Sequence, residues 1–246
     1  MVDVLIRRRL QLSRRIVEGA KFMKRVVQSE FLDTLPPNDQ RALRSRRDLR
    51  RVNVWMGNVG IMCRALKEHW PGTPKNITEL GAGDGNFLLR VAHRLNVQGV
   101  DAALLDIKKN VSAETLAAFS KLGWRAESVV ADVFDWPEGG AEIVVANLFI
   151  HHFEGAELGK LFEAVAGRAQ VFIAVEPHRF HFPFPCAQML RLIGCGPITL
   201  KDAETSIAAG FVRKEISALW PDQKNWRLTE RRAGLFSHLF VAKKIK

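Results

Sequence analysis

From residue 76 onward, short apolar segments alternate with longer stretches of helical periodicity, and this alternation limits the possible folds more than any other feature. It is typical of a mostly parallel sheet whose strands are joined by crossover helices. The last two apolar segments have no helical stretch between them, so we expect an antiparallel pair there. The expected strands cover residues 76–80, 97–106, 127–133, 142–148, 169–175, 212–219 and 237–245. The sequence therefore predicts an α/β fold with a Rossmann-like, seven-stranded, mostly parallel sheet and an antiparallel last strand, preceded by an N-terminal helical segment.

The helical segment at the N-terminus is expected in two parts. Apolar residues recur at helical spacing over residues 5–28 and again over residues 40–70. The Pro36-Pro37 pair separates the two parts, and Asn38 or Asp39 can cap the second. A turn at Pro71–Pro74 ends it. The expected units are a basic N-terminal helical cap, residues 1–74, and a core, residues 75–246.

Most of the net charge lies in the first unit. Residues 1–75 hold 17 Lys+Arg and 7 Asp+Glu, a net of +10, while the whole chain has +11. Three interpretations remain open for this basic segment. It can be a helical cap over the sheet with its arginines in solvent, a clamp for nucleic-acid phosphates, or an amphipathic helix that lies on an anionic membrane surface.

Cysteine use and hydropathy limit the cellular setting. Cys63, Cys186 and Cys195 are an odd number, with no pair and no histidine at metal-ligand spacing, so we expect reduced thiols and no metal site. The sequence has no apolar run of about 18 residues and no secretory signal pattern at its beginning. We expect a cytoplasmic protein.

A glycine-rich turn, TELGAGDGNF, follows the first expected strand and opens a helix. Gly81, Gly83 and Gly85 let a ligand approach the backbone at the carboxyl edge of the sheet. The turn lacks the Gly-Lys-Ser/Thr of a phosphate-binding loop, and Asn86 stands where a dinucleotide fingerprint needs a small residue. The carboxyl group of Glu79, two residues before the first glycine, suits a cationic ligand better than a pyrophosphate.

Two further acids end the next two expected strands. Asp106 lies about 20 residues beyond the glycines, the usual place for a carboxylate that accepts hydrogen bonds from ribose hydroxyls. Asp132 can accept a hydrogen bond from an adenine amino group. Together they indicate an adenosine pocket. A short-chain dehydrogenase would need a Tyr and Lys pair, and this chain contains no tyrosine.

The segments ELGAGDG, LLDI, VVADVFDW and IVVANLFIHHF, in this order and spacing, resemble the successive motifs of class I S-adenosylmethionine (SAM)-dependent methyltransferases that act on small molecules. The resemblance covers roughly residues 76–180. It implies that Glu79 and the glycines surround the methionine part of SAM, that Asp106 binds the ribose, and that Asp132 and Val133 bind the adenine. Asn147, at the end of the fourth strand, joins this cofactor-binding set.

His151 and His152 are the candidate catalytic residues. They follow the fourth strand, where the resemblance places the methyl acceptor, and an imidazole can take a proton from a phenol, an enol or an acidic carbon. Because the two are adjacent, we expect only one of them, His151 by preference, to face the acceptor. The alternative is that both histidines only support the turn.

The stretch after the fifth strand is a second candidate for the acceptor end. It holds Glu176, His178 and His181, and its aromatic residues Phe180, Phe182 and Phe184 suit a lid over a flat or apolar acceptor. They can equally fill a hydrophobic seam.

The functional expectation is a SAM-dependent methyltransferase whose partner is a small-molecule acceptor, aromatic or polyketide-like, methylated on oxygen or carbon. An RNA methyltransferase that uses the basic N-terminal segment is the alternative, although the Asn-Pro-Pro-aromatic motif of many amino-group methyltransferases is missing from NLFIHHF. A binding protein without activity on the same fold is the third possibility.

Overall fold

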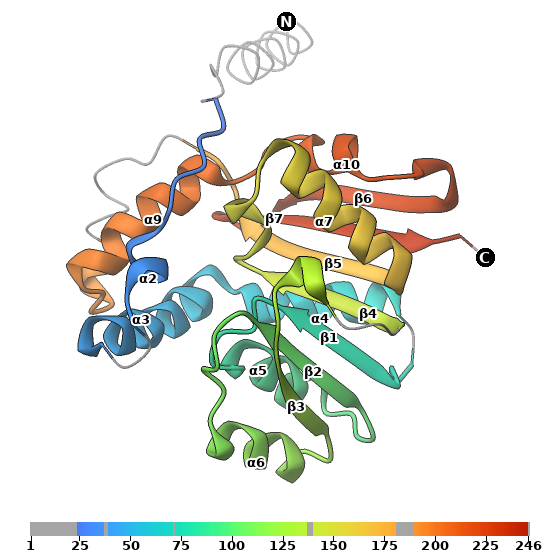
Figure 1. Cartoon of the computed structure of the whole chain (residues 1–246), viewed down its shortest axis with the longest axis horizontal. Coiled ribbons are helices and arrows are strands. Elements are labelled where there is room, and N and C mark those ends of the chain that lie inside the picture. Colours follow the sequence, from blue (N-terminus) through green and yellow to red (C-terminus); the bar gives the residue numbers. More distant parts are fainter. Residues whose placement is uncertain (1–23, 37–38, 71, 137–139, 181–188, 246) are drawn as a thin grey trace, which may run out of the picture.

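A computed structural model describes residues 24–36, 39–70, 72–136, 140–180 and 189–245 (Figure 1). The first expected helix lies almost wholly outside the described residues, and so do residues 181–188 of the stretch expected to form a lid. Residues 24–30, which the expected helix partly covers, form no helix and lead into the short α2 (Phe31–Thr34). Among the helices of the described residues, none has the length and apolar character needed to cross a membrane.

One seven-stranded sheet organises the chain, as predicted. Its order is β3-β2-β1-β4-β5-β7-β6. The first five strands are parallel, and β7 pairs antiparallel with both β5 and β6. The strands are β1 (Asn76–Leu80), β2 (Asp101–Asp106), β3 (Arg125–Val130), β4 (Ala141–Asn147), β5 (Ala169–Pro177), β6 (Trp226–Ala233) and β7 (Ser237–Lys244).

The sixth expected strand, residues 212–219, is wrong. This stretch contains α10 (Glu215–Leu219), and the strand that precedes β7 is β6. Val212, Ile216 and Trp220 are all buried and recur every fourth residue, which is a helical spacing. The carboxylate of Glu230 on β6 accepts hydrogen bonds from the first free N–H groups of α10 and so stabilises its beginning.

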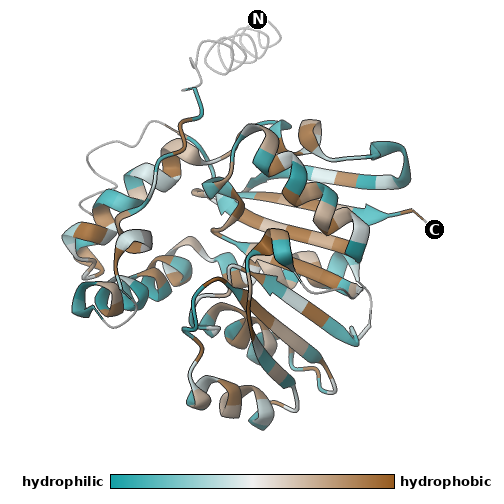
Figure 2. Ribbon diagram, viewed as in Figure 1, coloured by the Kyte–Doolittle hydropathy of each residue, from teal (hydrophilic) through white to brown (hydrophobic). Residues whose placement is uncertain are grey.

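Helices cover both faces of the sheet. Side chains of α4 (Asn58–His69), α5 (Asn86–Leu95) and α6 (Ala113–Lys121) form one core with one face, and side chains of α7 (Gly155–Arg168) and α10 form a second core with the other. Within β5, Val171 and Ile173 belong to the first core, and Phe172 and Ala174 belong to the second. The central strands are accordingly apolar along most of their length (Figure 2).

The second expected N-terminal helix is interrupted. Gly57, with φ of +72°, ends α3 (Gln40–Met56) and starts α4. Asp39 caps α3, as predicted, by accepting a hydrogen bond of 2.7 Å from the N–H of Arg41. α3 contacts α9 (Pro197–Ala209), and together with α2 these helices gather at one end of the sheet (Figure 1). The domain division near residue 74 stays a prediction, and α4 on its N-terminal side packs into the core of the sheet.

Candidate active site

A cavity of about 420 Å³ opens where β1, β2 and β4 end. The chain order reverses between β1 and β4, and such a switch point leaves a crevice at the carboxyl edge of a parallel sheet. Most of the predicted site residues line this cavity: Glu79, Gly81, Gly83, Asp106, Asp132, Val133, Asn147, His151 and His152. The fold therefore brings both predicted sets, for cofactor and for acceptor, to one cavity.

The three glycines of the turn have different surroundings. All have positive φ, between +57° and +73°. Gly81 and Gly83 line the cavity, whereas Gly85 is buried and caps α5. A methyl group added to Gly81 would collide with the ring of Phe149, while one added to Gly83 would meet nothing within 4 Å. Gly81 thus needs both the conformation and the small size of glycine.

Two of the acids hold backbone turns at the cavity wall. The Asp106 carboxylate accepts hydrogen bonds from the N–H groups of Gly83 and Lys108, both at 2.8 Å. Asp132 accepts one of 2.9 Å from the N–H of Phe134. Each carboxylate oxygen has two lone pairs, so these bonds leave acceptor capacity for a ligand.

Glu79 is a buried acid whose carboxyl group lacks a full set of hydrogen-bond partners. The residue is about 2% exposed, and its Oε2 has no hydrogen-bond partner among the described residues. Burial raises the pKa of Glu79 well above its usual range, and the negative charges of Asp84 and Asp106 raise it further. Burial thus favours the neutral form of the Glu79 carboxyl group, whose Oε2 has no hydrogen-bond partner among the described residues.

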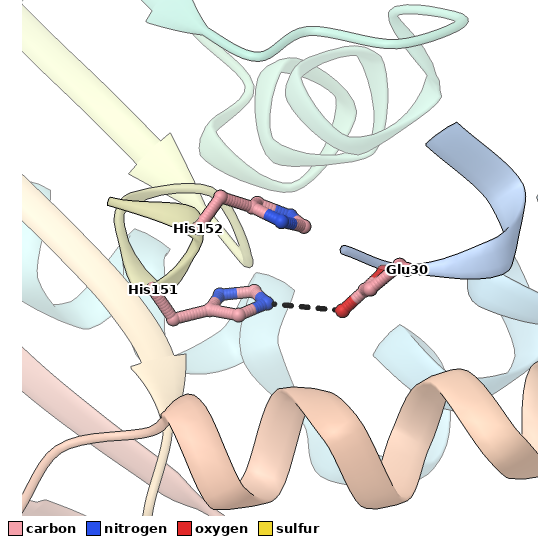
Figure 3. Close-up of side chains that lie close together, drawn as sticks. All are labelled: Glu30, His151 and His152. Atoms are coloured by element: carbon pink, nitrogen blue, oxygen red, sulfur yellow. Dashed lines mark hydrogen bonds and ion pairs between the residues drawn. The ribbon is translucent and has the colours of Figure 1, made fainter. Parts of the chain in front are cut away.

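His151 lies between two carboxylates. Its Nδ1 is 2.7 Å from Glu176 Oε2, and its Nε2 is 3.3 Å from Glu30 Oε1 (Figure 3). Burial alone would lower the pKa of His151, but the hydrogen bonds and charges of Glu176 and Glu30 outweigh it and raise the pKa to about 9. The isolated protein thus carries a buried imidazolium with a carboxylate on each side.

Glu176 positions the turn that carries the histidines. It is fully buried at the end of β5, and its carboxylate accepts hydrogen bonds from the N–H groups of Phe149, Ile150 and His151 at 3.0, 3.1 and 3.4 Å. The turn is a short 3₁₀ helix (Ile150–His152). Sequence reasoning singled out Glu176 by its place at a strand end, but not its contacts.

Both histidines line the cavity, and the expectation that only one of them faces the acceptor stays a prediction. Their rings are tilted against each other, with centroids 4.3 Å apart and an angle of 32° between the planes. Both side chains point toward Glu30 (Figure 3). The 3₁₀ turn explains this, because it replaces the alternation that an extended chain would impose on neighbouring side chains.

Glu30 and Arg25 were not found from the sequence. The Arg25 guanidinium donates hydrogen bonds to the carbonyl oxygens of His151, Phe153 and Ala209, and Glu30 accepts one from the hydroxyl of Ser206. This segment therefore lies along the histidine turn. The helical spacing expected as far as residue 28 gave no sign of this contact, because residues 24–30 run without regular structure into α2.

Asn147 connects the N-terminal helices to the site. Its side chain donates to Asn53 of α3 and accepts from Asn58 of α4, both at 2.9 Å. The end of β4 is thereby tied to α3 and α4, and Asn147 itself lines the cavity.

Comparisons with known proteins place the fold. No protein-family model matches the sequence, and no curated protein matches it. Among solved structures, an O-methyltransferase family protein from Burkholderia thailandensis superposes with a TM-score of 0.57 at 16% identity, over 82% of this chain and 59% of that one. The plantazolicin methyltransferase BamL, solved with SAH and a triazolic desmethylPZN analog, gives 0.60 at 11% identity, over 84% and 91%. The mitomycin 7-O-methyltransferase MmcR gives 0.56 at 15%, over 87% and 61%.

This chain has a methyltransferase fold. It spans only about three fifths of the Burkholderia protein and of the mitomycin enzyme, but nine tenths of the plantazolicin enzyme. The likeness at such low identity concerns the fold, and the activity has to be argued from the site.

Proposed function

We propose that the protein is a SAM-dependent methyltransferase that methylates oxygen or carbon of a small, aromatic or polyketide-like molecule. One observation carries the proposal: a single cavity holds the glycine turn with Glu79, Asp106 and Asp132, together with the imidazoles of His151 and His152. The first group suits a cationic adenosine derivative, and the second suits an acceptor that loses a proton. The solved structures named as O-methyltransferases and those that contain SAH support it.

In this proposal, different residues contact different parts of SAM. Glu79, Gly81 and Gly83 contact the methionine part, and Gly85 keeps the turn in place. Asp106 binds the ribose hydroxyls, and Asp132 with Val133 binds the adenine. Asn147 lies beside the reacting end, where it also holds α3 and α4 in place.

The reaction needs alignment and the removal of a proton. Bound SAM would supply an activated methyl group: a nucleophilic atom of the acceptor would bond to its methyl carbon while the carbon–sulfur bond breaks and SAH leaves. Glu30, His151 and His152 line the same cavity, where His152 can receive the acceptor proton and the imidazolium of His151 can stabilise the negative charge that develops on the acceptor. We assign the catalytic role to the two histidines, and the cavity walls supply the alignment.

Replacing Asp106 with alanine should weaken SAM binding about 10- to 150-fold. That range corresponds to about 1.5–3 kcal/mol for a lost hydrogen bond to a charged group. Calorimetric titration with SAM measures it. Asp101→Ala is the matched control, because Asp101 lies at the opposite end of β2, exposed and paired with Arg125. Equal affinity of the two variants would contradict the ribose-binding role of Asp106.

SAM binding should release a proton from Glu79. Burial favours the protonated form of Glu79 and a cationic ligand favours the carboxylate, so affinity should rise with pH below the raised pKa of Glu79. Titrations in phosphate and Tris buffers, which differ in ionisation enthalpy, detect the release. Glu79→Gln should abolish it. A binding heat independent of buffer in the unmodified protein would contradict the prediction.

The activity itself is tested by transfer of a labelled methyl group from SAM to a panel of phenolic and polyketide acceptors, with RNA as a comparison substrate. Methylated small molecules, with no label on RNA, are expected. Label on RNA alone would replace the proposal.

A further inference from the structure

Three potential metal ligands meet at the acceptor end of the cavity. Glu30, His151 and His152 each offer one ligand atom, and these atoms lie within 4.8 Å of one another. The side chains converge from the segment before α2 and from the turn after β4 (Figure 3). All three line the cavity, so an ion can reach the point between them.

The spacing on the two sides of His151 differs. Its bond to Glu176, 2.7 Å, has the length of a charge-assisted hydrogen bond, whereas the 3.3 Å from Nε2 to Glu30 Oε1 is longer than such bonds usually are. Two ligands bound tetrahedrally at about 2.0–2.1 Å lie about 3.3–3.4 Å from each other. His151 Nε2 and Glu30 Oε1 therefore already lie as far apart as two ligands of one ion. A modest rotation of the half-buried His152 side chain would add the third ligand.

Supporting residues already orient two of the three ligands. An ionised carboxylate only accepts hydrogen bonds, so the contact with Glu176 keeps one proton of His151 on Nδ1 and turns Nε2 toward the ligand cluster. A metal ion that binds Nε2 displaces the second proton of the imidazolium. A carboxylate behind a metal-binding imidazole is a recurring arrangement in metal sites. The hydroxyl of Ser206 in turn holds Glu30.

We propose that Glu30, His151 and His152 bind a divalent transition-metal ion of the Zn²⁺ class. Two imidazoles and one carboxylate suit zinc or iron(II), whereas Mg²⁺ and Ca²⁺ prefer ligand sets made of oxygen atoms. The expectation of no metal site rested on cysteine spacing and could not include Glu30. Three protein ligands leave a position open toward the cavity. If the proposed methyl transfer is correct, the acceptor oxygen binds there and loses its proton more easily, and the two histidines then contribute as metal ligands rather than as proton acceptors.

The test is direct metal binding. Protein stripped with a chelator is titrated with Zn²⁺ by calorimetry, and with Co²⁺ while visible absorption is followed. One equivalent of Zn²⁺ is expected, with visible Co²⁺ bands of a four- or five-coordinate site. His152→Ala should weaken Zn²⁺ binding at least 100-fold and leave the Glu30, His151 and Glu176 contacts in place. Glu176→Gln, which changes only the supporting residue, should weaken it about 10- to 100-fold.

His93→Ala is the matched control, because His93 is exposed on α5 away from the three ligands. Its affinity for Zn²⁺ should equal that of the unmodified protein. The proposal fails if the stripped protein binds no stoichiometric Zn²⁺, or if binding survives in both His152→Ala and Glu30→Gln. SAM titration of the same stripped protein separates the two proposals. If SAM binds but Zn²⁺ does not, only the metal site is overturned. If Zn²⁺ binds but SAM does not, only the methyltransferase proposal is overturned.

Discussion

Replacing Gly81 with alanine is expected to abolish SAM binding and to lower the free energy of unfolding by about 3–5 kcal/mol. The backbone there has φ of +64°, which costs a residue with a side chain about 1–3 kcal/mol. The added Cβ would also lie 2.6 Å from Phe149 Cγ and closer still to Cδ2. Phe149 has little freedom to move, because Glu176 holds its N–H and its ring packs edge-on against Phe153. Calorimetry and thermal denaturation measure the two effects.

The variant Gly83→Ala separates the cost of a positive φ from the cost of the steric collision with Phe149. Its φ of +57° is similar, but no atom lies within 4 Å of the added Cβ. This variant should lose stability only through backbone strain and should therefore denature well above the Gly81 variant. If the two variants denature at the same temperature, the contact with Phe149 does not limit this turn.

Replacing Glu176 with alanine is expected to lower the unfolding free energy by about 3–5 kcal/mol and to remove methyl transfer. The change leaves the N–H groups of the histidine turn and the ring of His151 without their buried acceptor, and each unpaired buried group costs about 1–3 kcal/mol. For a chain of this size such a loss lowers Tm by roughly 6–20 °C.

Two comparisons make the Glu176 result specific. Glu176→Gln keeps one carbonyl oxygen for the turn and should fall between the alanine variant and the unmodified protein. Glu163→Ala removes an exposed carboxylate from α7 and should change Tm little. If the Glu176→Ala and Glu163→Ala proteins have the same Tm, the histidine turn does not depend on the Glu176 carboxylate.

The sheet and the cofactor end of the cavity were predictable from the sequence because local signals mark them. Each of Glu79, Asp106 and Asp132 comes at or just after the end of an apolar strand, and parallel strands bring such ends to one edge. The wrong strand at residues 212–219 came from giving a short apolar stretch a period of two. The buried residues Val212, Ile216 and Trp220 recur every fourth position, a helical spacing that can also be read in the sequence.

The acceptor end was only partly predictable. The place of His151 and His152 after β4 pointed to them, but no pattern announced the 3₁₀ turn that aims both rings the same way. Glu30 reaches His151 through the packing of an irregular segment against α9 and the turn, and tertiary packing of this kind leaves no periodic trace in the sequence.

The two ends of the cavity also differ in how far apart their parts lie along the chain. Asp106 and Gly83, which meet at the cofactor end, are 23 residues apart, whereas Glu30 is 121 residues from His151 and 176 from Ser206. Closing a long loop costs more chain entropy than closing a short one, and domains form their local contacts first. During synthesis the cofactor end can be complete while the residues that fix Glu30 are still missing. A growing chain can therefore have Asp106 and the glycine turn in place while Glu30 is not yet held.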